Sequence, residues 1–198
     1  MLHLQNYLSE SQQREILHHC REIGKRAPLF IPTMKNRSPF NYQMTNCGKV
    51  GWISDQNGYQ YIENHPVTNK PWQPIPEVIR NLTKSLAAKV GDYNFTPETC
   101  LINYYQKENS KLGIHQDNTE INKAAPIISI SLGDDGIFLI GGKRRKDPTK
   151  EIILKSGDIL ILHDESRMFY HGIKGIVPGT SNLLNSGGRL NLTIRQVY

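Results

Sequence analysis

The segment PIISISLGDDGIFLIGG, residues 126–142, contains two short apolar runs separated by a turn. Both runs, 127–132 and 136–140, have the length and the branched apolar composition of β-strands, and Gly-Asp-Asp and Gly-Gly mark turns beside them. Further segments of this character lie on either side, at residues 101–105, 152–154, 158–162, 169–173 and 189–196. Because no helical pattern interrupts these strands, residues 101–196 predict an antiparallel barrel or sandwich.

Two amphipathic helices are expected before the strands. The first covers residues 9–24, where Ser9 and Gln12 form a capping-box pattern and Gly24 is a stop signal. The second follows Pro76 and closes at Gly91, with one apolar stripe along it. We expect an α+β chain that is mainly β, in which the helices buttress the strands.

Residues 28–76, between the helices, are rich in Pro, Asn, Gly and Tyr and show no long periodic run. A stretch of this length is too long for an ordinary connection and predicts a functional loop system or lid. The 198 residues suffice for one sizeable core. We therefore expect a single domain over 1–198, with a lid region over about 28–75 and a β-core over about 100–198.

Composition sets further limits. The apolar stretches are too short to span a membrane, and the N-terminus has no secretory pattern. Three scattered cysteines without CxxC spacing favour a reducing cytoplasm. The net charge of +6 favours encounter with a polyanion such as nucleic acid, although many basic proteins bind none. Charge alone leaves the partner open.

A His-x-Asp pattern, His115-Gln116-Asp117, is the first candidate for chemistry. Roughly 0.3 such patterns are expected by chance in this chain, so context must support it. In an extended segment residues i and i+2 share a face, so both side chains can point at one ion. His171 follows Phe-Tyr in the strand region and can supply a third ligand, whereas His163, in an HxE pattern, is a decoy.

Two imidazoles and one carboxylate on one face of an octahedron are the ligand set of non-haem iron(II) oxygenases. The alternative is a surface histidine beside an acid and a half-buried strand histidine. Ligand spacing alone does not decide between the two.

The C-terminal strand RLNLTIR, residues 189–195, alternates strictly between polar and apolar side chains. Its polar face either meets water or points Arg189 and Arg195 into a barrel, while the apolar face packs on helices. Buried arginines require anions, and a guanidinium grips a carboxylate through two parallel hydrogen bonds. Two such arginines suit a dicarboxylate such as 2-oxoglutarate. Asn103 and Tyr105 share one face of another strand in the same way.

The blocks CLINYY, KLGIHQDN, PIISISLG, GDILIL, ESRMFYHGI and RLNLTIRQ resemble those of bacterial AlkB proteins in order and spacing. MTNCGKVGW, the following Gly58-Tyr59, and TNKPW extend the resemblance upstream. It covers about residues 44–196 and leaves the first 43 residues unplaced.

The resemblance implies a double-stranded β-helix (jelly roll) core with a nucleotide-recognition lid, and an iron(II)- and 2-oxoglutarate-dependent dioxygenase that uses O2. It implies oxidative demethylation of bases such as 1-methyladenine and 3-methylcytosine in DNA or RNA, as in repair of alkylation damage, with release of formaldehyde, succinate and CO2. We expect a single-stranded substrate, no membrane and no obligate protein partner. The implied iron ligands are His115, Asp117 and His171, and the implied base-pocket aromatics are Trp52 and Tyr59. For 2-oxoglutarate, the resemblance implies Arg189, Asn191 and Tyr105 at the distal carboxylate, with Arg195 and Asn103 near the iron-bound end.

This sequence also departs from the family pattern. Thr119 stands where an acid that approaches the base is expected, with Glu120 next to it, and Leu162 replaces a tryptophan. These differences leave the metal set intact but leave lesion preference open. Arg145 belongs to the basic run 143–146, which is either a solvated surface or a phosphate contact.

Three other interpretations remain. An oxygenase of this kind could hydroxylate a protein or a small molecule instead of a base. A jelly roll could bind nucleic acid without catalysis, although the intact ligands and arginines disfavour this. A structural zinc site is disfavoured because no fourth ligand has suitable spacing.

Overall fold

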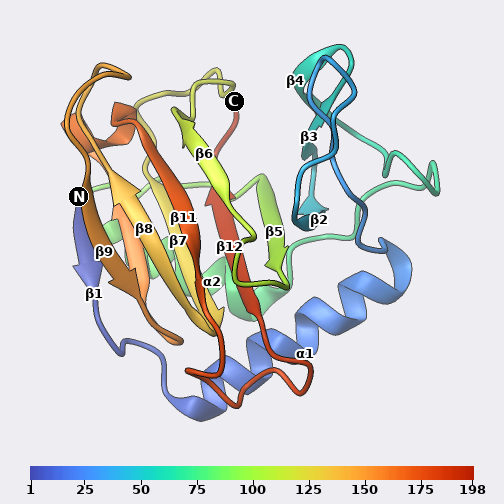
Figure 1. The fold of residues 1–198 in the computed structure, drawn as a ribbon, viewed down its shortest axis with the longest axis horizontal. Helices are drawn as coiled ribbons and strands as arrows, with labels where there is room; N and C mark the ends of the chain where they lie inside the picture. Colours follow the sequence, from blue (N-terminus) through green and yellow to red (C-terminus); the bar gives the residue numbers. More distant parts are fainter.

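The computed structural model describes all residues from 1 to 198, and Figure 1 shows a sandwich of β-sheets with two helices packed against it. The larger sheet has the strand order β1 (Leu2–Leu4), β10 (Ile159–Leu162), β7 (Ile127–Gly133), β12 (Arg189–Arg195), β5 (Thr99–Tyr105) and β2 (Gln43–Gly48). The smaller sheet has the order β6 (Leu112–His115), β11 (His171–Val177), β8 (Asp135–Ile140) and β9 (Lys150–Leu154). Every pairing is antiparallel.

The chain crosses repeatedly between the two sheets. From β7 it passes to β8 and β9 in the smaller sheet, returns to β10 in the larger, and alternates again through β11 and β12. This winding is that of a double-stranded β-helix, or jelly roll, which confirms the expected fold class.

The larger sheet is buried on both faces. On its outer face, Leu190, Leu192 and Ile194 of β12 join a core cluster that also contains residues of both helices. A second cluster lies between the sheets. Of the two arrangements expected for β12, the structure has the one in which the polar face is enclosed. Its apolar side packs on the helices, while its polar side, with Arg189 and Arg195, lies between the sheets.

Helix α1 (Glu10–Arg26) begins at the expected capping box, in which the Ser9 hydroxyl accepts from the Gln12 amide and the Gln12 side chain accepts from the Ser9 amide at 2.9 Å. The expected stop at Gly24 is wrong. Nothing lies within 4 Å of the position its Cβ would take, so the helix tolerates the glycine and ends just before Pro28. Helix α2 (Glu77–Ala88) is followed by Gly91 at φ +88°.

Outside the predicted lid region, two strands were not expected. Strand β1 pairs with β10 at the edge of the larger sheet, so the first residues of the chain belong to the β-core. Strand β6 carries His115 and pairs with β11, which starts at His171 rather than at Phe169.

Residues 28–75 divide into two parts. Strand β2 lies within the larger sheet, whereas β3 (Gly51–Asp55) and β4 (Gly58–Ile62) form a separate hairpin that stands beside the sandwich (Figure 1). Neither helix has the length and apolar character needed to cross a bilayer.

Candidate metal and co-substrate site

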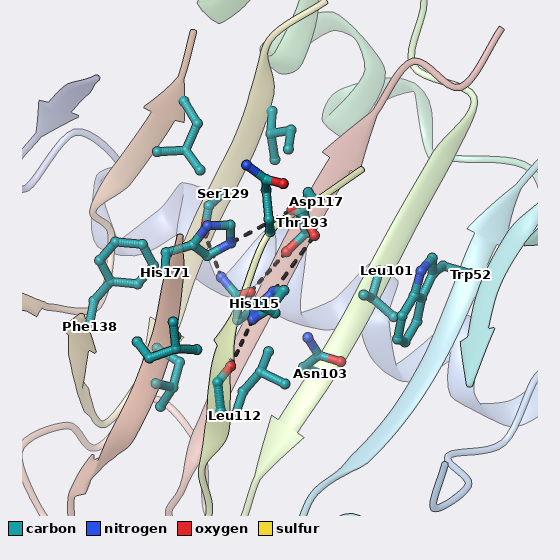
Figure 2. A pocket seen from close by; sticks show the side chains of 18 of the residues that line it. Trp52, Leu101, Asn103, Leu112, His115, Asp117, Ser129, Phe138, His171 and Thr193 are labelled. Carbon is teal, nitrogen blue, oxygen red and sulfur yellow. Dashed lines mark hydrogen bonds and ion pairs between the residues drawn. The ribbon is translucent and has the colours of Figure 1, made fainter. Parts of the chain in front are cut away.

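A cavity of about 410 Å³ lies between the two sheets and opens beside the hairpin β3–β4. Figure 2 shows His115, Asp117 and His171 near its centre, with Asn103, Trp52 and Phe138 around them. All twelve residues expected in the site from the sequence line this cavity.

The jelly-roll register brings the three candidate metal ligands together. His115 ends β6 and His171 begins β11, and the two are direct partners in the pairing of these strands. Asp117 follows two residues after His115. Its carboxylate oxygens lie 3.6 Å from His115 Nε2 and 3.7 Å from His171 Nε2, and one ligand atom from each residue lies within 4.8 Å of the others.

The surroundings of these side chains suit a divalent metal. The Nδ1 atoms of His115 and His171 lie 2.9 Å from the carbonyl oxygens of Gly113 and Phe169. Donation from Nδ1 leaves each Nε2 lone pair free to bind a metal. Burial lowers the pKa of His171 to about 4, which keeps its imidazole neutral.

Asp117 is held in its ionised form. Burial alone would raise the pKa of its carboxyl group, but the Arg195 guanidinium beside it holds that pKa below its usual range. Neutral imidazoles beside an ionised carboxylate are the protonation states that metal binding requires. The donor set therefore fits iron(II).

A second part of the cavity is suited to a carboxylate. Arg189 is completely buried; its Nη atoms donate to Leu154 O at 3.2 Å and Ser131 Oγ at 2.8 Å, but its Nε has no partner. Burial lowers the pKa of Arg189 to about 10, which still leaves the guanidinium charged at neutral pH. A buried charge with a free donor calls for an anion.

The pairing of β5 with β12 places the other expected 2-oxoglutarate residues in cross-strand pairs. Tyr105 is the register partner of Arg189, and Asn103 is the partner of Asn191. Asn103 Oδ1 is buried without a partner, and Asn191 donates to Ser129 Oγ at 2.7 Å. The donor free to bind a carboxylate here is Arg189 Nε, and together with the buried charges of Arg189 and Arg195 it fits a dicarboxylate co-substrate.

Arg195 lines the same cavity but lies against the metal ligand. Its Nη2 donates to Asp117 Oδ1 at 2.9 Å, and its Nε is 3.5 Å from Glu120 Oε1. The sequence pattern does not indicate this contact, because it depends on the path of the loop after β6.

The mouth of the cavity is aromatic. The rings of Trp52 and Tyr59 have centroids 5.4 Å apart at 30°, and Tyr59 is 61% exposed. Within the basic run, Arg144 pairs with Asp147 and Lys143 with Glu165, whereas the exposed Arg145 lines the cavity.

Both departures from the family pattern also lie in the cavity. Thr119 and Leu162 are lining residues, whereas the neighbouring Glu120 points away and is 3% exposed, paired with Arg167 at 3.0 Å. His163 lies outside the cavity lining, 2.7 Å from Asp164, which agrees with its rejection as a ligand.

Several residues around the site were not singled out from the sequence. Met34, Phe40 and Tyr42 line the cavity, and Tyr61 and Arg167 bond to the loop that carries Asp117. Their positions depend on contacts between distant segments, and no local motif marks them. Only the position of Tyr61, two residues after Tyr59 in an extended segment, signals that it shares the face of the pocket aromatics.

Comparison with known proteins gives consistent matches. The 2OG-Fe(II) oxygenase superfamily pattern matches residues 1–195, including the segment that the sequence blocks left unplaced. The AlkB homolog of Caulobacter vibrioides, an alpha-ketoglutarate-dependent dioxygenase, is 39% identical over 189 residues, covering 96% of this chain and 84% of that protein. Escherichia coli AlkB is 38% identical over 182 residues, covering 92% and 83%. The structure of OsALKBH1 has a TM-score of 0.82 at 28% identity and covers 98% of this chain and 97% of that one.

Proposed function

Because this chain belongs to the 2OG-Fe(II) oxygenase superfamily, and to the AlkB family within it, we propose that it oxidatively demethylates N-alkylated bases in nucleic acid. It is an iron(II)- and 2-oxoglutarate-dependent dioxygenase that uses O2. We assign one domain over residues 1–198, with a lid region over about 28–75 and a catalytic core over about 100–198.

In this proposal His115, Asp117 and His171 hold the iron. The chemistry that bound iron(II) supplies is oxidation of a C–H bond by O2, coupled to conversion of 2-oxoglutarate to succinate and CO2. Hydroxylation of an N-methyl carbon gives an N-hydroxymethyl base, which releases formaldehyde and restores the unmodified base.

The side chains of the cavity divide the remaining work. Arg189, Asn191 and Tyr105 bind the distal carboxylate of 2-oxoglutarate, with Asn103 and Arg195 toward its other end. Trp52 and Tyr59 provide faces on which a base turned out of its strand can stack. The single observation that carries the proposal is that one cavity contains a buried arginine with a free donor, three candidate metal ligands and a pair of aromatic rings.

The substrate class rests on relatives and on charge. ALKBH1D of Arabidopsis thaliana, 33% identical over 220 residues, is named a DNA N(6)-methyladenine demethylase, and the human relative ALKBH1, 32% identical over 175 residues, a nucleic acid dioxygenase. The net charge of +6 favours a polyanion. We propose a single strand, whose bases can enter the cavity without breaking pairs, and a cytoplasmic location, consistent with three buried free cysteines.

The test is incubation with iron(II), 2-oxoglutarate, ascorbate and a short single strand carrying one 3-methylcytosine, followed by mass spectrometry. We expect loss of one methylene mass that depends on 2-oxoglutarate. Succinate above background without this loss would point to another substrate, such as a protein or a small molecule. Neither product, with iron bound, would favour a non-catalytic binding module.

A further inference from the structure

The inner face of the hairpin β3–β4 carries a third aromatic residue beside the two that line the cavity mouth. Tyr61 is the direct register partner of Trp52, and it shares its face with Tyr59, two residues earlier. Instead of lining the cavity, Tyr61 is half-buried and its hydroxyl donates to Oε1 of Glu120. The proposed function gives this contact no role.

Glu120 is a buried carboxylate between two arginines. It is 3% exposed, with Arg167 Nη2 at 3.0 Å from Oε2 and Arg195 Nε at 3.5 Å from Oε1. Arg195 also donates to Asp117 Oδ1 at 2.9 Å, and its Nη1 lies 3.5 Å from the Tyr61 oxygen. Tyr61, Glu120, Arg195 and Asp117 thus form one continuous polar network.

Arg167 fixes this network in place. Besides Glu120, it donates to the carbonyl oxygens of Asp117 at 2.6 Å and Ala125 at 2.9 Å. It therefore braces the loop that carries Asp117 from the segment just before His171. Because Arg167 holds the Glu120 carboxylate, this carboxylate cannot move together with the hairpin. If the hairpin shifts, the Tyr61 hydroxyl loses its hydrogen bond to a charged acceptor.

Other hydrogen bonds attach the hairpin elsewhere. The Asn46 side chain bonds both backbone groups of Trp52, at 3.0 and 3.1 Å, and Ser54 Oγ donates to Thr33 O at 2.7 Å. These contacts join the hairpin to β2 and to the segment before it. Among the hydrogen bonds of the hairpin, only those of Tyr61 reach Glu120 and Arg195 beside the metal ligand.

We propose that Tyr61 is a positioning residue, whose hydroxyl joins the base-stacking hairpin to the carboxylate network behind Asp117. The position of the stacked base and the orientation of the Asp117 carboxylate are then coupled through Tyr61. This inference rests on the proposed function, because the base is the group being positioned. Without the hydroxyl, the hairpin moves independently of the carboxylate network behind Asp117. Because the base is then held less often in position, 2-oxoglutarate is more often consumed without demethylation.

The test compares Tyr61→Phe with Tyr104→Phe, each lacking one tyrosine hydroxyl that makes a hydrogen bond. Tyr104 donates to Gly187 O at 3.2 Å and does not line the cavity, so it is a matched control. The first measurement is amide hydrogen exchange of residues 51–62 in the unreacted protein. The second is the ratio of succinate to formaldehyde formed with a 3-methylcytosine single strand.

For Tyr61→Phe we expect hairpin exchange to be faster by about tenfold, the scale of one hydrogen bond to a charged acceptor. We also expect the succinate-to-formaldehyde ratio to rise at least about threefold, with neither change in Tyr104→Phe. Unchanged exchange overturns the proposal, and so does faster exchange with an unchanged product ratio, which makes the contact merely structural. If the wild-type protein releases no formaldehyde, the proposed function fails first and this inference fails with it.

Discussion

His171 is the residue that ties the metal site to the sandwich, since it begins β11 and pairs directly with His115. We expect His171→Ala to lower formaldehyde release at least about a hundredfold, because even the partners of metal ligands cost 10–100-fold when removed. His163→Ala, at the rejected HxE pattern, should stay within about twofold of wild type because His163 does not line the cavity. Near-normal turnover of the His171 variant would show that the ligand assignment is wrong.

Thr119 lines the cavity at the position where the family pattern leads us to expect an acid. The only acid that lines the cavity is Asp117, and its carboxylate already pairs with Arg195. A cationic base such as 3-methylcytosine therefore meets no free carboxylate there.

We expect Thr119→Asp to raise the rate on 3-methylcytosine relative to neutral 3-methylthymine by about fivefold, the effect of one partly screened charge pair. The asparagine of Thr119→Asn has the same shape as aspartate without its charge. This variant should therefore leave the ratio of the two rates unchanged. The measurement is competition between the two lesions in single strands of one sequence. Equal ratios in the two variants would exclude a charge effect at this position.

Single residues differ in how far the sequence predicts their contacts. The candidate metal ligands were predicted as a set from HxD and a later strand histidine, with the family resemblance deciding what their spacing left open. Arg195 was expected near the iron-bound end of the co-substrate, but its direct pairing with Asp117 was not expected. Alternation shows that such a side chain is enclosed, but its partner depends on a loop from another part of the chain.

Among the structural elements, strands with strong local patterns were predictable and short ones were not. The alternation of β12 located that strand to within a residue. Strands β1 and β6, of three and four residues, carry too little pattern, and their pairing partners lie far away in the sequence. The start of α1 was predictable from its capping box, whereas its end was not, because Gly24 fits inside the helix.

One buried carboxylate contacts strand β1 and the residues around it. Asp158, 1% exposed, accepts from the amides of Asn6 at 2.8 Å and Lys155 at 2.9 Å and lies 2.9 Å from His3 Nε2. We expect Asp158→Ala to lower the free energy of unfolding by about 2–4 kcal/mol, because it removes the contacts of three donors with one buried carboxylate. Urea unfolding measures this, and exchange of residues 2–4 should rise more than that of β12.

A surface carboxylate provides the control for Asp158. Glu151 pairs with Lys174 while half of its side chain is exposed, so Glu151→Ala should leave stability within error of wild type. Equal unfolding midpoints for the Asp158 and Glu151 variants would mean that β1 is not held by this carboxylate.

For the whole molecule, the sequence predicts the layers better than the connections. Helices followed by many short strands indicate a buttressed sandwich, and the structure has that arrangement. The jelly-roll winding pairs strands that are distant in sequence, such as β5 with β12, and came from the resemblance alone. No local pattern records which strands become neighbours, since the pairing is decided by the packing of the complete core.

The charge of the whole molecule gives the final prediction. A chain with net charge +6 that neutralises backbone phosphates binds a single strand more weakly as salt rises, with a slope of about −0.7 per phosphate contact on a logarithmic plot. If Arg145 at the cavity mouth makes one such contact, Arg145→Ala should make this slope shallower by about one contact.

Arg144→Ala removes the same charge one residue away. Its guanidinium is already engaged by Asp147 at 2.8 Å, so the slope should stay as in the wild type. Fluorescence anisotropy with a labelled single strand from about 50 to 200 mM salt makes the comparison. Equal slopes for the two variants would mean that Arg145 contacts no phosphate and contributes only to the net positive charge of the protein. A shallower slope for Arg145→Ala alone would fix the direction in which the strand leaves the cavity, past the turn between β8 and β9.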